Sequence, residues 1–407
     1  MEFSAVIGII AEYNPFHRGH ARQLAKARQE LGPVPVIAVM SGSLTQRGQL
    51  PLWDKWRRAR LALLGGVDLV LELPVIGSLQ SAQGFARTGI ALLEATGLVT
   101  HLSFGCEAKD PARLLSLSQE VFSPAEWQEA LASGGSYAKG AEILAAARNP
   151  AYQELFTGSN NLLALEYLKA LQSHPGIRPL PIHREGQAYG ESQLTSDPDP
   201  FPSASALRQE LRTQGCTARF LEGLPPQLRS LCQNWVGEKG LPDTEKALDL
   251  LLAAALEKAS PSLLASWTQV SEGLEDRIWK HRRAGSFAAL VEASRTRRYP
   301  ASRIRRILWQ LLLSGPGCSF RDAAAHPPSY LRVLGFTQTG RQLLRAMKKT
   351  ARLPLFPALE KNTMAQAPSP AFRQQLELDL RAQDLYQLLT EGRITDKDYR
   401  MQPVREK

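Results

Sequence analysis

The chain has 407 residues, 43% of them hydrophobic and 22% charged, and carries a formal net charge of +10. This composition excludes a largely disordered protein, and at roughly 100 to 200 residues per domain the length predicts two domains. The four cysteines are far apart and form no CxxC pair, which argues against a disulfide framework and a zinc site and fits a reducing cytoplasm.

The first third of the chain alternates apolar runs with helical patterns. Continuously apolar runs, which are typical of strands buried on both faces, lie at residues 5–10, 34–40, 67–73 and 101–105. Helical patterns lie between them at residues 20–31, 54–64 and 81–95. This alternation predicts an α/β fold with a Rossmann-like, doubly wound parallel sheet. The first run lacks a basic leader and is soon broken by polar residues, so we expect neither a signal peptide nor a membrane span.

The pattern changes in the middle of the chain. A fifth apolar run at 180–185 follows a helical pattern at 161–171, and a loop rich in proline, serine and aspartate comes next. That loop ends where Ser203 or Ser205 can cap a helix. After about Gly215 amphipathic helices prevail with few strand signals, which predicts a mainly α-helical C-terminal domain. We therefore divide the chain into residues 1–215 and 216–407.

The segment EYNPFHRGH, residues 12–20, follows the first strand and opens the first helix. In an open parallel sheet this position lies at the carboxyl ends of the strands, where ligands bind. Two histidines three residues apart at a helix N-terminus, with Gly19 between them, suit a triphosphate. A lone histidine would more often cap a helix or pack in the core. The pair His17 and His20 after Asn-Pro favours a role in stabilising the charge on leaving pyrophosphate.

Arginines concentrate in the second half. Ten basic residues lie between Arg277 and Arg306, and aromatic residues interleave with them, a pattern that suits stacking on unpaired RNA bases. The alternative is a solvated helical face over a core, which we favour for Trp309. Arg47, on a loop after the second strand, can face phosphate or RNA. The predicted RNA-binding residues are Arg47, Arg297, Arg298, Arg303, Arg305, Arg306, Lys348 and Lys349.

Two motifs carry a resemblance to known proteins. NPFHRGH resembles the HxGH-type signature of the nucleotidyltransferase superfamily, and Ser203 to Arg208 matches its later SxxxxR element. Further segments, among them SGSLTQRG, DLVLELP, FGCE, GSNN, HREG and YLRVLGF, resemble the tRNA(Met) cytidine acetate ligase family over nearly the whole chain. One departure is visible, because that family usually has asparagine and an aromatic residue at Ser43 and Leu44.

The resemblance implies a specific reaction. ATP and acetate form acetyl-adenylate with release of pyrophosphate, and the acetyl group passes to the exocyclic amine of the wobble cytidine of elongator tRNA(Met). The partners implied are this tRNA, ATP and acetate, with no DNA and no membrane. The catalytic residues implied are His17, His20 and Arg208. The ATP-binding residues implied are Ile7, Gly8, Ile9, Ile10, Ala11, Glu12, Tyr13, Asn14, Pro15, Phe16, His17, Arg18, Gly19, His20, Gly105, Asn160, Asn161, Arg184 and Ser203.

Other readings of the sequence stay open. An adenylyltransferase that makes a dinucleotide-type cofactor shares the N-terminal motif, but the long basic helical half argues against it. A third possibility is an RNA-binding protein with a degenerate nucleotide-binding fold, but the retained HxxH and SxxxxR motifs argue against it. Which of Asn160 and Asn161 contacts ATP is undecided, and Glu72 either orients a partner or caps a loop. We find no metal-ligand cluster, and Mg²⁺ is expected to accompany ATP.

Overall fold

The structure is a computed structural model that describes residues 3–132, 135–156, 158–184, 201–267, 269–271, 273–315, 317–360 and 362–406. It confirms the predicted α/β class. Within the described residues an eight-stranded sheet has the order β5-β4-β1-β2-β3-β6-β7, and β8 pairs with β6. The strands are β1 (Ile7–Ala11), β2 (Val36–Ser41), β3 (Leu69–Leu73), β4 (His101–Cys106), β5 (Arg178–His183), β6 (Leu331–Phe336), β7 (Leu355–Phe356) and β8 (Val404–Arg405).

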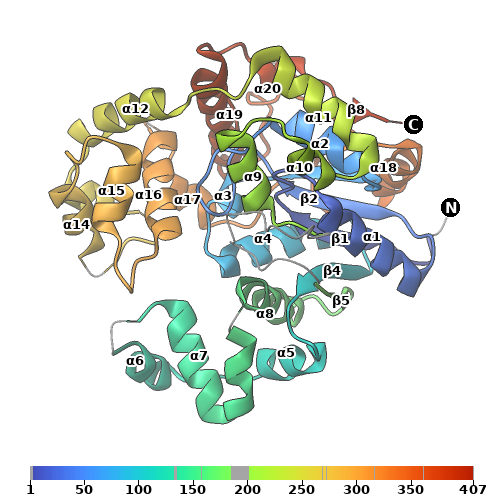
Figure 1. The fold of residues 1–407 in the computed structure, drawn as a ribbon, viewed down its shortest axis with the longest axis horizontal. Helices are drawn as coiled ribbons and strands as arrows, with labels where there is room; N and C mark the ends of the chain where they lie inside the picture. The colour runs from blue at the N-terminus through green and yellow to red at the C-terminus, as the bar shows by residue number, and fades with distance from the viewer. Residues whose placement is uncertain are drawn as a thin grey trace.

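Helices cover both faces of this sheet and continue beyond it (Figure 1). In chain order they are α1 (Arg18–Leu31), α2 (Lys55–Leu64), α3 (Val75–Ser78), α4 (Ala82–Ala95), α5 (Pro111–Ser118), α6 (Pro124–Ala132), α7 (Tyr137–Arg148), the 3₁₀ helix η1 (Pro150–Phe156), α8 (Ser159–Leu171), α9 (Ala204–Thr213), α10 (Ala218–Glu222), α11 (Pro226–Lys239), α12 (Glu245–Glu257), α13 (Pro261–Ala265), α14 (Leu274–Lys280), α15 (Phe287–Ser294), α16 (Ala301–Leu313), α17 (Phe320–Ala324), α18 (Gln338–Thr350), α19 (Pro370–Glu391) and α20 (Lys397–Arg400).

The five strands from the first half run parallel, as predicted. β1 pairs with β2 and β4, β2 with β3, and β4 with β5. Strands β1, β2 and β3 are almost fully buried because an apolar core covers each face of the sheet. One core receives side chains from α4, α8 and α18, and the other receives side chains from α1, α2 and α9 to α11. The continuous apolar runs of the sequence reflect this double coverage.

The second half is mainly helical, as predicted, but it also supplies part of the sheet. β6 pairs antiparallel with β3, with Leu69 opposite Phe336, and β7 and β8 pair parallel with β6. The sheet is therefore mixed and not wholly parallel. The segment YLRVLGF was noted for its resemblance, but its strand partner lies more than 250 residues away, so no local pattern revealed the pairing.

A third apolar core lies within the helical region. It joins side chains of α12, α15, α16 and α19 with those of α3 and of Leu44 from the first half. In Figure 1 helices α12 and α14 to α17 lie to one side of the sheet. Helices α10 and α11, which follow residue 215, still pack on the sheet. The division at residue 215 stays a prediction, and by packing the separate helical core begins with α12.

Candidate active site

A cavity of about 680 Å³ lies at the carboxyl ends of the parallel strands. Its walls include the segment after β1, Gln46 and Arg47 after β2, Gly105 at the end of β4, and Arg184 after β5. Residues of α7, α8 and α9 and of the region around α16 complete it. Ligands bind at this edge of open α/β sheets. The cavity therefore lies where the N-terminal motif predicts a site, and both halves of the chain contribute to it.

His17 and His20 meet at the start of α1 and line this cavity. The Nδ1 atom of His17 accepts a hydrogen bond from the backbone N–H of Gly19 at 3.0 Å, and Nδ1 of His20 accepts one from the N–H of His17 at 3.2 Å. The two ring centroids are 3.9 Å apart. Because Nδ1 of each ring is an acceptor, the proton of each neutral imidazole lies on Nε2. His17 therefore caps the helix, which is the alternative role considered for a single histidine. Each ring still has an N–H group that can donate to a ligand.

Burial keeps both imidazoles uncharged. It lowers the pKa of His17 well below the usual 6.5, and the charges of His20, Arg184 and Arg208 lower it further. It also lowers the pKa of His20 to about 3, with a smaller contribution from Arg184. Both rings are therefore neutral at pH 7. They can donate hydrogen bonds, while the positive charge of the site comes from the arginines.

Arg208 reaches the N-terminal motif from α9. Its Nη1 donates to the carbonyl oxygen of Asn14 at 2.7 Å, and its Nη2 donates to the hydroxyl of Ser205 at 3.0 Å. Ser203, and not Ser205, is the cap of this helix, since its hydroxyl accepts a hydrogen bond from the N–H of Ala206 at 3.0 Å. Ser203 is buried behind the wall, whereas Arg208 lines the cavity.

The two neighbouring asparagines have different positions. Asn160 lines the cavity, and its Oδ1 accepts a hydrogen bond from Arg184 Nη1 at 3.1 Å. Asn161 is buried, and its Oδ1 accepts hydrogen bonds from the N–H groups of Glu107 and Ala108 at 2.7 and 3.0 Å. The Glu107 carboxylate in turn accepts from the side chain of Asn160 at 2.5 Å. Of the two asparagines, only Asn160 faces the space that a ligand can occupy.

The predicted ATP-binding segment from Ile7 to His20 likewise contains residues that line the cavity and residues that do not. Its cavity-lining members are Ile9, Ile10, Ala11, Glu12, Tyr13, Asn14, His17, Gly19 and His20. The other five lie outside the lining, and two of them have evident packing roles. Phe16 is fully buried, and Gly8 lies against Leu93 and Val99, where a Cβ atom would clash. These two residues therefore support the site by packing and do not face the cavity.

The loop after β2 is fixed from several sides. Its Gln46 N–H donates to Glu12 Oε1 at 2.7 Å, and Arg58 donates to the carbonyl oxygens of both Glu12 and Gly42. Ser43 donates to Gln383 of α19 at 2.8 Å, and Leu44 is buried in the helical core. The two positions that depart from the family pattern therefore contact the second half of the chain and do not line the cavity.

The predicted RNA-binding arginines fall into two groups. Arg47, Arg298, Arg303 and Arg306 line the cavity, whereas Arg297 and Arg305 lie outside the lining. Arg306 is only 6% exposed and donates to Gln269 Oε1 at 2.8 Å and to the carbonyl of Gln46 at 3.3 Å. Its guanidinium thus connects α16 to the loop after β2. Trp309 is buried and donates to the Gly48 carbonyl at 3.0 Å, which confirms its prediction as a core residue.

Lys348 and Lys349 are at the end of α18, away from this cavity. The next residues of the chain contact the segment before β4, where Thr350 donates to the carbonyl of Thr96 at 2.8 Å and the N–H of Arg352 to that of Ala95. This is the edge of the sheet opposite the carboxyl ends of the strands. The structure therefore does not bring the two lysines together with the arginines of α16.

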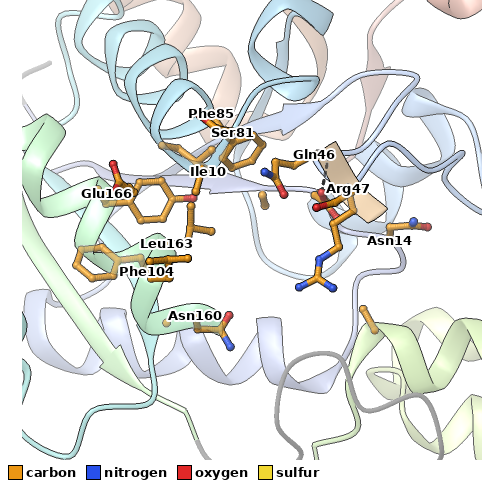
Figure 2. A pocket seen from close by; sticks show the side chains of 18 of the residues that line it. Ile10, Asn14, Gln46, Arg47, Ser81, Phe85, Phe104, Asn160, Leu163 and Glu166 are labelled. Atoms are coloured by element: carbon orange, nitrogen blue, oxygen red, sulfur yellow. Dashed lines mark hydrogen bonds between the residues drawn. The ribbon is translucent and has the colours of Figure 1, made fainter. Parts of the chain in front are cut away.

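One wall of the cavity was missed by sequence reasoning. Figure 2 shows Phe85, Phe104, Leu163 and Glu166 around one side of the cavity, with Arg47 and Asn14 on the other. Tyr137 of α7 also lines this side. Their signal was weak, because the run LLALEYLK reads as an ordinary helix and the segment between β4 and α8 received no element prediction.

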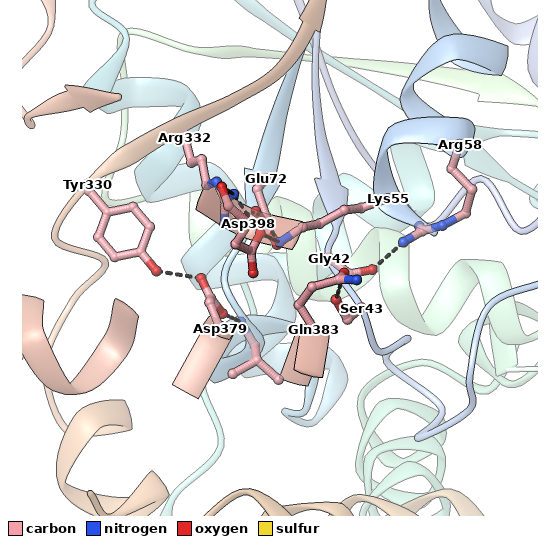
Figure 3. Close-up of polar contacts among 11 residues, drawn as sticks. Gly42, Ser43, Lys55, Arg58, Glu72, Tyr330, Arg332, Asp379, Gln383 and Asp398 are labelled. Carbon is pink, nitrogen blue, oxygen red and sulfur yellow. Dashed lines mark hydrogen bonds and ion pairs between the residues drawn. The ribbon is translucent and has the colours of Figure 1, made fainter. Parts of the chain in front are cut away.

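Glu72 belongs to a buried ionic network beside the site (Figure 3). Its carboxylate pairs with Lys55 Nζ at 2.8 Å and with Arg332 Nη1 at 3.3 Å, and both cations also pair with Asp398, at 2.8 and 2.6 Å. Neighbouring Asp379 accepts hydrogen bonds from Val75 N–H and from a tyrosine hydroxyl. Glu72 therefore orients partners, and the network joins α2 and β3 to β6 and α20.

Comparison with known proteins extends this picture. The family model described as HIGH Nucleotidyl Transferase matches residues 4–402. The tRNA(Met) cytidine acetate ligase of Syntrophomonas wolfei is 32% identical over 98% of this chain and 99% of its own length. That of Thermoanaerobacter sp. strain X514 is 34% identical over 94% of this chain and 95% of its own. The chain belongs to the tRNA(Met) cytidine acetate ligase family.

Solved structures of a family member have the same fold. The apo crystal structure of Thermotoga maritima TmcAL superimposes with a TM-score of 0.87 at 29% identity, covering 98% of this chain and 99% of that one. The structure of the same protein bound with alpha-thio ATP gives a TM-score of 0.84. Fold and family resemblance, both predicted from the sequence, are therefore confirmed.

Three further properties concern the described part of the chain. Within it, no group of three or more histidine, cysteine, aspartate and glutamate side chains is arranged to hold a metal ion. No described helix combines the length and the apolar character needed to cross a membrane. The four cysteines are free thiols, and three of them are buried.

Proposed function

We propose that this protein is an ATP-dependent ligase that acetylates the wobble cytidine of elongator tRNA(Met). The reaction activates acetate as acetyl-adenylate, releases pyrophosphate, and transfers the acetyl group to the N4 amine to give N4-acetylcytidine. The observation that carries the proposal is the pair of neutral, Nε2-protonated histidines in one cavity with Arg184 and Arg208. Membership of a family whose members bear this name supports the choice of acid and acceptor.

In the first step an acetate oxygen bonds to the α-phosphorus of ATP, and the bond from that phosphorus to the departing oxygen breaks. Negative charge then grows on pyrophosphate. His17 and His20 donate hydrogen bonds to these oxygens, and Arg208 and Arg184 offer planar pairs of donors to phosphate. Because both imidazoles start neutral, they stabilise the leaving group as hydrogen-bond donors that are fixed in place by their Nδ1 contacts.

The proposed ATP contacts are those predicted residues that line the cavity. We assign to ATP the lining members of the Ile7–His20 segment together with Gly105, Asn160 and Arg184. Asn160 is preferred over Asn161, whose Oδ1 already accepts two backbone N–H groups. Ser203 acts indirectly, because it caps the helix that presents Arg208.

The RNA contacts are assigned to the helical half. Arg298 and Arg303 line the cavity from the region of α16, next to Arg47, so an RNA that enters from this side meets positive charge at the mouth of the site. Arg297, Arg305, Lys348 and Lys349 remain proposed contacts outside the cavity. We assign to Arg306 the positioning of the loop after β2, in view of its burial and its bond to Gln46.

Mg²⁺ is proposed to arrive with ATP as part of the substrate. The Glu12 carboxylate lines the cavity but already accepts a hydrogen bond from Gln46. Phosphate oxygens and water are therefore the expected ligands, as is common for Mg²⁺ at nucleotide sites. A cytoplasmic location, where ATP and tRNA are both present, fits the four free thiols.

The decisive experiment supplies the protein with labelled acetate, ATP and transcribed elongator tRNA(Met), with either cytidine or uridine at the wobble position. We expect label only in the cytidine RNA. If neither RNA is labelled and pyrophosphate is still released with some small phosphorylated acceptor, the protein is instead an adenylyltransferase of the kind that makes dinucleotide cofactors. Binding of RNA without any pyrophosphate release would indicate a degenerate nucleotide fold.

A further inference from the structure

The part of the cavity wall that contains Phe85, Phe104, Leu163 and Glu166 has no role in the assignments above. Phe85, Phe104 and Leu163 give it an apolar surface, and Glu166 places a carboxyl group among them (Figure 2). The polar groups assigned to ATP lie at the ends of β1, β4 and β5 and at the start of α8. An apolar wall with a single acidic group is typical of a site for a flat, partly polar ring.

The Glu166 carboxyl is buried at the cavity wall and is held in place by neighbouring groups. Its side chain is only 2% exposed, and the Tyr137 hydroxyl hydrogen-bonds it from α7. Its Oε1 atom pairs with Lys169 Nζ at 3.7 Å, which is too long for a direct hydrogen bond. Glu166 is therefore a carboxyl group held at the cavity wall among apolar side chains, where a donor from a ligand can add to its partners.

The surroundings also adjust the acidity of this group. Burial raises the pKa of Glu166 above the usual 4.5, while Lys169, Arg87 and the Tyr137 hydroxyl oppose that rise. Lys169 is on the same helix, Arg87 on α4, and Tyr137 on α7, so these are the charged and polar groups that face the carboxyl. A carboxylate with a raised pKa accepts a proton more readily than one in water.

We propose that this wall receives the cytosine ring of the acceptor nucleotide and that Glu166 accepts the proton that its N4 amine loses. The inference rests on the proposed function and adds to it the residue that completes acetyl transfer. Phe85, Phe104 and Leu163 provide apolar contact for the ring, and Glu166 accepts a hydrogen bond from the amine. Glu166 is then a catalytic residue of the second step, because it touches the reacting atom.

The step balances as follows. The N4 lone pair bonds to the acetyl carbonyl carbon of acetyl-adenylate, and the bond from that carbon to the AMP oxygen breaks. AMP leaves with the electron pair as a phosphate monoester. One proton passes from N4 to the Glu166 carboxylate and then to water. An exocyclic amine of cytosine is a weak nucleophile because its lone pair is delocalised into the ring, so removal of this proton is needed for the amide to form.

Two other occupants of the wall are less consistent with its chemistry. Acetate is an anion and would be repelled by an ionised Glu166. Adenine also carries an exocyclic amine, but Gly105, Asn160 and Arg184 already offer a place for the adenosine beside the histidines. The two half-reactions distinguish these occupants of the wall. Acetate and ATP take part in the first step, whereas the acceptor base takes part only in the second.

The test compares Glu166→Gln with wild-type protein in two assays. Acetate-dependent exchange of pyrophosphate into ATP reports the first step, and labelled acetyl transfer from ATP and acetate to tRNA reports the whole reaction. We expect exchange within about twofold of wild type and transfer reduced by about 10²- to 10⁴-fold, the usual contribution of a general base. The matched control is Glu94→Gln, on α4, whose carboxylate pairs with His174 away from the cavity; both activities should stay unchanged.

A second variant gives a readout that a purely structural role would not change. The Tyr137 hydroxyl lowers the pKa of Glu166, so Tyr137→Phe should raise it. Because the carboxylate must be ionised to accept the proton, the acidic limb of the transfer rate should move to higher pH in this variant. The same limb should be absent in Glu166→Gln. The exchange rate should show neither change.

The outcomes distinguish this inference from the proposed function. If wild-type protein shows no acetate-dependent exchange, the proposed function fails. If wild type performs both steps and Glu166→Gln still transfers at the wild-type rate, the proton acceptor is another group and the inference is wrong. If Glu166→Gln instead raises the KM for ATP or for acetate in the exchange assay, the wall holds adenine or acetate, and the assignment to cytosine is overturned.

Discussion

Two buried polar clusters of this protein differ in what their charged and polar groups face. In the network of Lys55, Glu72, Arg332 and Asp398 each cation contacts two carboxylates and each carboxylate contacts two cations. At the cavity, by contrast, the Nδ1 atoms of His17 and His20 accept backbone hydrogen bonds, while both rings and Glu166 line the space that a ligand can occupy.

The two clusters therefore differ in role, because the ionic network stabilises the fold and the groups at the cavity can act on a ligand. Ions that neutralise each other in the interior hold distant segments together, and they offer nothing to a ligand. Polar groups at a cavity wall can, by contrast, form hydrogen bonds to a ligand. The comparison can be tested by variants that should affect stability in one cluster and chemistry in the other.

The largest effect is expected from Arg332→Met. This variant leaves Asp398 and Glu72 buried with Lys55 as their one remaining cation among the described residues, and breaking such a pair typically costs about 3 to 5 kcal/mol. Urea unfolding followed by circular dichroism measures the free energy of unfolding. The control is Arg352→Met, whose partner Glu94 lies 3.6 Å away and whose side chain is 69% exposed; its cost should stay below about 1 kcal/mol. Equal costs would show that the network is not stabilising through paired burial.

His20→Ala should leave stability nearly intact and abolish most chemistry. Loss of one preorganised donor to a developing charge costs about 2.7 to 4 kcal/mol of transition-state stabilisation, or about 10²- to 10³-fold in rate. The rate of acetate-dependent pyrophosphate exchange measures this, and tRNA affinity should be nearly unchanged. His17→Asn is a useful companion, because asparagine still caps the helix but does not replace the Nε2–H donor. An equal loss of tRNA binding and exchange would argue against this division of roles.

The neighbouring asparagines offer a matched pair. Asn161→Ala removes the acceptor of two buried N–H groups, which should cost about 1 to 3 kcal/mol of unfolding free energy. Asn160→Ala should instead raise the KM for ATP with a smaller change in stability, since its side chain faces the cavity. Steady-state exchange kinetics and urea unfolding of both variants make the comparison. A reversed outcome would exchange the roles of the two residues.

The smallest effects concern RNA binding. Replacing Arg298 by alanine should reduce by about 1 the slope of the logarithm of tRNA affinity against the logarithm of salt concentration, if one phosphate contact is lost. Replacing Lys348 and Lys349 together should reduce it by about 2 without changing acetyl transfer at saturating tRNA, because they lie away from the cavity. Fluorescence anisotropy with labelled tRNA at several salt concentrations provides the slopes. An unchanged slope removes the residue concerned from the interface.

What the sequence predicted well was encoded locally. The five parallel strands and the helices between them follow from continuous apolar runs and helical periodicity, and Asp54 and Ser81 cap α2 and α4 at the predicted starts. The histidine pair was identifiable because its residues are only three positions apart and follow a strand. The family resemblance then added the reaction, which no periodicity contains.

What could not be predicted depends on contacts between distant segments. The partners of Glu72 are contributed by residues 55 and 332, and those of Asp379 by residues 75 and 330. The choice between Asn160 and Asn161 depends on which side chain turns toward the backbone after β4. Glu166 resembles any polar residue of an amphipathic helix until α8 is placed against the cavity.

The position of β6 has a consequence for the order in which the chain can mature. Until residues 331–336 have left the ribosome, β3 has an unpaired edge, since its other neighbour is β2. An open strand edge readily pairs with another chain. Contacts between segments so far apart in sequence also form slowly. The nascent protein therefore passes through a period in which most of its nucleotide-binding sheet is present but vulnerable to aggregation, and arrival of β6 ends that period.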